Sequence, residues 1–65
     1  MKAITVPGSV VTKETAPGYL RRVARKLLNP VTQASSIVLT DIERALVNAG
    51  FMTWEETEEI EMEVM

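Results

Sequence analysis

The chain has 65 residues, which leaves room for one small domain spanning residues 1–65. It contains no cysteine or histidine, so disulfides and the usual zinc sites are excluded as sources of stability. Its net charge is only −2, but the first 50 residues carry seven bases and three acids, whereas the last 15 carry six acids and no base. This separation of charge along the chain is its most unusual feature, and it predicts either two helix faces that attract each other or a surface for a charged partner.

Residues 2–13 (KAITVPGSVVTK) predict an extended segment or a hairpin. β-Branched residues flank Pro7 and Gly8, a pattern typical of two short strands around a turn. Pro-Gly favours a type II turn, whereas two-residue hairpins prefer the primed turn types. A hairpin and a flexible arm over residues 1–16, pairing with a second copy or another protein, therefore both stay open.

Residues 17–29 (PGYLRRVARKLLN) predict an amphipathic helix. Pro17 suits the first turn of a helix and Pro30 stops it. One face is apolar: Tyr19, Leu20, Val23, Ala24, Leu27 and Leu28. The opposite face carries Arg21, Arg22, Arg25 and Lys26. We interpret this basic face as the solvated side of a core helix, with a working surface for an anionic partner as the alternative.

Residues 40–49 predict a second helix. Thr40 and Glu43 have the spacing of a capping box, and an apolar stripe that includes Ile42 and Leu46 follows at helical spacing. Gly50 sits where a left-handed residue would close the helix. The preceding residues 31–39 are ambiguous, because they read either as a loop ending in a short strand or as the apolar staple before the next helix.

Residues 53–61 predict a third helix, because Thr53 and Glu56 repeat the capping box directly after the glycine corner. The tail stays open between helix and strand, since apolar and acidic residues alternate from residue 59 to residue 64. The stretch ALVNAGF, residues 45–51, resembles the glycine–aromatic loop of ubiquitin-associated three-helix domains over a few residues, and no property of that family is carried over from it. The predicted fold is mainly α, a small α+β protein with about three short helices.

The residue types argue against several classes of function. The two helices around Gly50 suggest a DNA-binding helix-turn-helix, but its second helix would present six carboxylates to the phosphates. No histidine or cysteine is present to act as base or nucleophile, and the carboxylates lie along one solvated helix. No glycine-rich phosphate loop or calcium-binding loop occurs either. We expect no catalysis, no cofactor and no metal site.

The leading hypothesis is a small cytoplasmic protein–protein interaction module, an inhibitor or adaptor of viral or mobile-element type. Its acidic C-terminal helix would dock on a basic, nucleic-acid-binding surface of another protein. The expected binding residues are Phe51, Trp54, Glu55, Glu56, Glu58 and Glu59. One alternative is an antitoxin-like nucleic-acid-binding regulator that uses the basic face of residues 17–29; another is an assembly subunit of a larger particle. We expect a homo-oligomer or a heteromeric complex, nucleic acid as a less favoured partner, and no membrane span, since the chain has no long apolar run.

Overall fold

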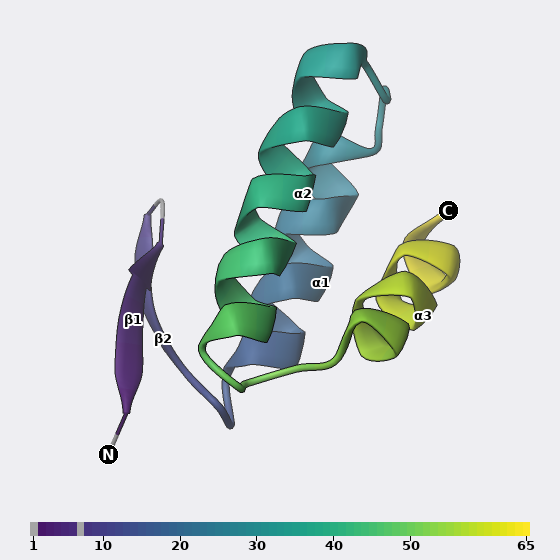
Figure 1. Ribbon diagram of the computed structural model, residues 1–65. Coiled ribbons are helices and arrows are strands. Elements are labelled where there is room, and N and C mark those ends of the chain that lie inside the picture. The colour runs from purple at the N-terminus through teal and green to yellow at the C-terminus, as the bar shows by residue number, and fades with distance from the viewer. Residues whose placement is uncertain (1, 7) are drawn as a thin grey trace.

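The computed structural model describes residues 2–6 and 8–65, which form a β-hairpin and three helices (Figure 1). The elements are β1 (Ala3–Val6), β2 (Ser9–Thr12), α1 (Ala16–Leu27), α2 (Gln33–Asn48) and α3 (Trp54–Val64). Figure 1 shows α1 and α2 side by side, with the hairpin on one side of this pair and α3 on the other. The predicted mainly α fold with a small β component is confirmed.

The N-terminal segment is a hairpin, which settles the choice between a hairpin and an extended arm. Val6 pairs with Ser9, so the connection has two residues, and Gly8 has a φ of +79°. That angle is the one required at the second central position of the type II turn that Pro-Gly favours; Pro7 itself lies outside the described residues. The hairpin is held to the body by Val6 and Val11, which are 6% and 1% exposed.

Helix α1 lies at the centre of the packing and contacts β2, α2 and α3. Its first residue, Ala16, is fully buried, as are Leu20 and Ala24. The helix begins one residue before the predicted start and ends at Leu27, two residues before the predicted end at residue 29 and ahead of Pro30. The largest fully buried side chains come from four elements and include Leu20 of α1, Leu39 and Leu46 of α2, Val11 of β2 and Thr57 of α3. The core therefore depends on contacts between segments that are distant in sequence.

Helix α2 begins seven residues before the predicted start at Thr40. Its N-cap is Thr32, whose Oγ1 accepts a hydrogen bond of 3.0 Å from the backbone N–H of Ser35. Thr40 lies in the middle of the helix, where its hydroxyl donates to the carbonyl of Ser36 at 2.9 Å. The predicted capping box at Thr40 is wrong, and so are the loop, strand and staple interpretations of residues 33–39. The helix extends because Leu39 continues the buried side formed with residues 42 and 46.

The corner between α2 and α3 has the predicted geometry. Gly50 has a φ of +78°, and its N–H donates to the carbonyl of Val47 at 3.0 Å. The N–H of Phe51 donates to the carbonyl of Leu46 at 3.0 Å, which completes a Schellman motif. Because the left-handed conformation of Gly50 ends α2, the chain turns and can start α3 four residues later.

Helix α3 starts with the predicted capping box and continues beyond its predicted end. Thr53 Oγ1 accepts from the N–H of Glu56 at 3.2 Å, and Glu56 Oε1 accepts from the N–H of Thr53 at 3.1 Å. The helix runs to Val64 rather than ending at residue 61, so the strand alternative for the tail is wrong. Ile60 and Val64 lie four residues apart on the packed side of α3, which extends the helix.

Alanine substitutions at Thr53, which caps α3, and at Thr40, which was predicted to cap α2 but lies inside it, should have different effects on the free energy of unfolding. Thr53→Ala removes the side-chain oxygen that caps α3 and should lower the free energy of unfolding by about 1 kcal/mol. Thr40→Ala removes only an exposed mid-helix hydroxyl, so we expect a change within about 0.5 kcal/mol. Urea denaturation followed by circular dichroism measures both. Equal losses in the two variants would contradict this assignment of the caps.

Candidate functional site

Helix α3 places its predicted acidic residues on the solvent side. Thr57 and Ile60 are buried at 0% and 5% exposure, and they orient the helix against the body. The hydroxyl of Thr57 donates to the carbonyl of Trp54 at 2.7 Å, so this buried polar group is satisfied within the helix. With these residues inward, helical periodicity leaves four side chains exposed on one surface, which we call the acidic face: Glu55, Glu56, Glu58 and Glu59.

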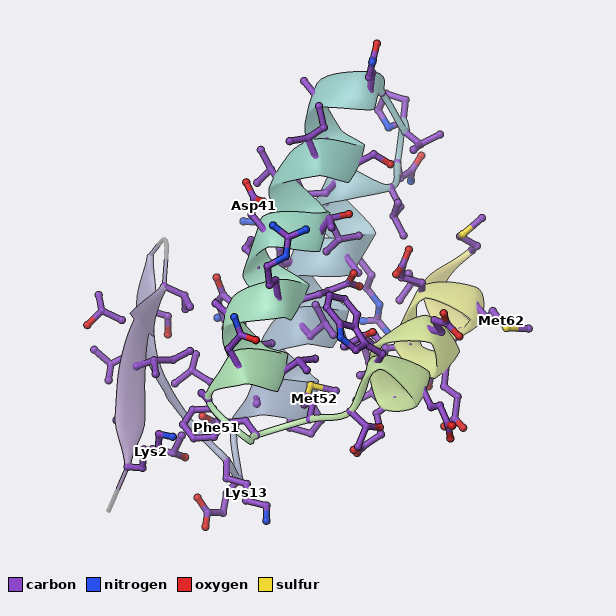
Figure 2. The ribbon with its side chains drawn as sticks, in the orientation of Figure 1. Lys2, Lys13, Asp41, Phe51, Met52 and Met62 are labelled. Atoms are coloured by element: carbon purple, nitrogen blue, oxygen red, sulfur yellow. The ribbon has the colours of Figure 1, made fainter. Side chains whose placement is uncertain are left out.

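The two predicted aromatic residues occupy different environments. Trp54 is 44% exposed at the first position of α3, next to the acidic face. Phe51 is only 6% exposed and packs in the core, on the hairpin side of the corner in Figure 2. Trp54 is therefore the aromatic residue that a partner could contact directly, whereas Phe51 acts on the site only by stabilising the corner before α3.

Two methionines that the sequence did not single out extend this surface. Met62 and Met65 are 77% and 85% exposed, and Figure 2 shows Met62 projecting from α3 away from the other helices. Together with Glu58 and Glu61 they line a shallow surface cavity of about 300 Å³, the Met/Glu pocket. The helical spacing of residues 58, 61, 62 and 65 is the sequence signal for this pocket. It becomes visible only when the tail is assigned to a helix.

Glu43 is buried beneath α3 instead of capping α2. Its residue is 4% exposed, and Oε2 has no hydrogen-bond partner among the described residues. Burial, which has the largest effect, a hydrogen-bonding interaction with Glu61 and the negative charges of Glu61 and Glu58 together raise the pKa of Glu43 to about 8. Glu43 is therefore mostly protonated at neutral pH. It forms a cluster of three carboxyl groups with Glu61, which is half-buried, and Glu58, which is exposed on the acidic face.

The basic residues predicted to form one surface on α1 differ in their contacts. Arg21 forms a salt bridge with Glu63 of α3, with 3.2 Å between Nη2 and Oε2. The Arg22 guanidinium lies 5.7 Å from the centre of the Tyr19 ring. Arg25 and Lys26 are exposed on the same outer face as Arg22. The structure thus joins the basic and acidic helices at one partly exposed contact, which contributes about 0–1 kcal/mol, and leaves most of both charged surfaces free.

Three further findings concern similarity to known proteins, membrane-spanning helices and metal-binding groups. Comparisons of the chain with known protein families, curated proteins and solved structures find no match. Within residues 2–6 and 8–65, no helix has both the length and the hydropathy needed to cross a membrane. The same residues contain no group of three or more acidic side chains arranged to hold a metal ion, and this includes the cluster around Glu43.

Proposed function

We propose that the protein is a small interaction module, an inhibitor or adaptor of viral or mobile-element type, that acts in the cytoplasm. Its acidic face binds a basic surface of another protein, one that otherwise contacts nucleic acid. The supporting observation is the exposed row of carboxylates on α3, in which Glu55, Glu58 and Glu59 have no ion-pair partner in the part of the chain that the structure describes.

The physical basis of the proposal is electrostatic complementarity. Several negative charges on one face of a helix produce an electric field that attracts a protein with a cationic surface and increases the rate of association. A protein surface that binds phosphates through lysine and arginine presents the matching charge. Trp54, half-exposed at the start of α3, supplies an aromatic contact of the kind enriched in interfaces. The same charges exclude nucleic acid as a ligand of this face.

The glutamine variant of the acidic face tests this function. Replacing Glu55, Glu56, Glu58 and Glu59 with glutamine should weaken target binding by about 10- to 100-fold, because each exposed charge pair contributes up to about 1 kcal/mol. Glutamine keeps the capping box at position 56 functional, so α3 should stay folded. Affinity can be followed through the fluorescence of Trp54, which is the single tryptophan of the chain.

The matched control changes the opposite charge. Replacing Arg22, Arg25 and Lys26 with glutamine alters exposed residues on α1 and should leave target binding within about threefold of the wild-type value, since it adds no repulsion. Raising the salt concentration should weaken binding of the wild-type protein and affect the acidic-face variant much less. Unchanged affinity of the acidic-face variant would reject the proposal.

Nucleic-acid binding through α1 is the second candidate, because Arg22, Arg25 and Lys26 are exposed on one face. Few phosphates could be contacted by this short helix, and Arg21 is already paired with Glu63. A fluorescence anisotropy titration on mixed-sequence DNA at low salt tests it. Even non-specific binders reach dissociation constants of about 10⁻⁴–10⁻⁶ M, so weaker binding would eliminate this candidate.

A further inference from the structure

A groove of about 260 Å³ lies between β1 and α2, away from the acidic face. Six residues of these two elements, most of them apolar, line it: Thr5, Val6, Val38, Asp41, Ile42 and Ala45. Figure 1 shows β1 running alongside α2 over this stretch. Because no residue of α3 lines the groove, it belongs to a second surface, distinct from the one proposed to bind the target.

An apolar strip along the outer side of α2 adjoins the groove at Val38. Ala34, Ile37 and Val38 are exposed there, and their spacing of three and four residues places them on one side of the helix. Ile37 and Val38 are 56% and 45% exposed, a large exposure for β-branched side chains. Contiguous exposed apolar surface marks interaction sites. The strip and the groove together therefore form one candidate interface.

The strand beside the groove has a free edge, since β1 pairs only with β2 in the described part of the chain. The pair next to a two-residue turn is hydrogen-bonded, and hydrogen-bonded and non-hydrogen-bonded pairs alternate along antiparallel strands. Because Val6 pairs with Ser9 beside the turn, Thr5 and Val10 form a pair of the second type, and their N–H and C=O groups point to the two outer edges of the hairpin. Those of Thr5 lie beside the groove and have no backbone partner within residues 2–6 and 8–65. Such an edge is a template for a strand of another chain.

The charges beside the strip are self-complementary. Asp41 and Arg44 form a salt bridge with 3.8 Å between Oδ1 and Nη1, and their side chains are 67% and 60% exposed. When two α2 helices pack antiparallel about a two-fold axis between these residues, Asp41 of each copy lies opposite Arg44 of the other. A two-fold axis repeats every contact, so the interface gains two such pairs. A partner surface of a single charge would instead meet a like charge at one of the two positions.

We propose that this face binds a second copy of the chain in a two-fold symmetric dimer. In this dimer β1 pairs antiparallel with β1 of the second copy, and α2 packs antiparallel on its counterpart. One axis serves both contacts, because the groove places Thr5 at the level of residues 38 to 45 of α2. Pairing of the Thr5 edges joins the two hairpins into one sheet, and packing of the helices removes Ile37 and Val38 from water. The acidic faces on α3 take no part in these contacts.

The dimer should be weak, because each copy contributes only a four-residue strand and residues 34 to 45 of α2. Interfaces that bury less than about 1,200 Å² in total are typically transient. We therefore expect a dissociation constant of tens of micromolar. The monomer then predominates at the low micromolar concentrations used for circular dichroism.

Sedimentation equilibrium from the low micromolar to the millimolar range measures the dimer, and charge reversal locates it. Asp41→Arg places arginine opposite arginine in the dimer, and Arg44→Asp places aspartate opposite aspartate. Each variant alone should dimerise about tenfold more weakly than the wild-type protein, because both symmetry-related pairs become repulsive. Glu55→Arg is the control, because it reverses a charge at an exposed position on α3 and should leave dimerisation unchanged.

An equal mixture of the two reversed variants should dimerise again. With Asp41→Arg in one copy and Arg44→Asp in the other, every facing pair is oppositely charged. Mixed dimers should therefore form with an affinity close to that of the wild-type protein. Each variant also loses the salt bridge within its own chain, which mixing does not repair, so recovery reports a contact between copies.

Amide hydrogen exchange tests the strand pairing in the wild-type protein. The N–H of Thr5 should exchange more slowly at millimolar concentration than in dilute solution, because pairing with the second copy gives it a hydrogen-bond acceptor. The N–H of Val10 points to the other edge of the hairpin and is the internal control, since its exchange should not depend on concentration. This measurement requires no variant to fold.

The proposal fails under three outcomes. A chain that stays monomeric at millimolar concentration would leave the groove to an extended segment of another protein. A dimer that the charge reversals do not weaken, or that their mixture does not restore, would be built on another surface. Exchange of the Thr5 N–H that is independent of concentration would exclude the pairing of β1. The function proposed for the acidic face is judged separately, by the response of its target to the glutamine variant.

Discussion

Replacing Glu43 with glutamine should stabilise the fold above pH 8 and change its stability little near pH 4.5. The side chain is 4% exposed, and burial, the interaction with Glu61 and the charges of Glu61 and Glu58 raise its pKa from 4.5 to about 8. Between pH 4.5 and pH 8, therefore, Glu43 is protonated in the folded protein and ionised in the unfolded chain. Its contribution to stability is complete below about pH 4.5, decreases as the pH rises towards 8, and is lost above that value.

Glutamine matches the shape of protonated glutamic acid but does not ionise, so the variant avoids this loss. One pKa unit corresponds to about 1.4 kcal/mol, and local opening that lets water reach the ionised carboxylate reduces the full effect. We expect a gain of about 2 kcal/mol above pH 8, or roughly 10 °C in Tm for a domain of this size. Thermal unfolding followed by circular dichroism across this pH range measures the gain.

Glu55→Gln is the control for the Glu43 experiment, because it removes the same charge from an exposed position on α3. Its unfolding curve should follow that of the wild-type protein at every pH. If the Tm of Glu43→Gln runs parallel to the wild-type Tm from pH 4.5 to pH 8, then Glu43 does not titrate abnormally in the fold.

Leu46→Ala should lower the free energy of unfolding by about 3 kcal/mol, within the range of about 2–5 kcal/mol for buried leucines. Leu46 is fully buried in the core with Leu20 and Leu39, one turn before the corner at Gly50. Alanine is the best helix former, so the loss reports packing rather than helix propensity. Since domains of this length have a net stability of roughly 3–10 kcal/mol, this loss removes about a third or more of the stability, and the variant should unfold at a clearly lower urea concentration than the wild-type protein.

Ile37→Ala is the matched control for Leu46→Ala, because it truncates an aliphatic side chain on the same helix at a position that is 56% exposed. We expect a change below about 0.5 kcal/mol in urea denaturation. A loss as large as that of Leu46→Ala would show that the outer face of α2 is covered in solution, for example by a second copy. A small effect at Leu46 would contradict the core described above.

The sequence alone predicted the features that depend on hydrogen bonds between near neighbours. The Schellman motif at Gly50, the capping box of Thr53 and Glu56 and the stop at Pro30 each involve residues at most five positions apart. Their geometry follows from the conformational preferences of glycine and proline and from the reach of short polar side chains. The mainly α fold and the exposure of the acidic face on α3 followed from these signals together with helical periodicity.

Tertiary packing overruled the local capping signal at Thr40. The burial of Leu39 against the core extends α2 to an N-cap at Thr32, which the sequence analysis did not identify. Packing of α3 against α1 likewise extended α3 to Val64. The same packing buried Glu43, which the sequence suggested as a capping residue, close to the carboxyl groups of Glu61 and Glu58 of α3. These outcomes depend on contacts between segments far apart in the chain, whose free energy exceeds that of a single cap and is not encoded in any short stretch of sequence.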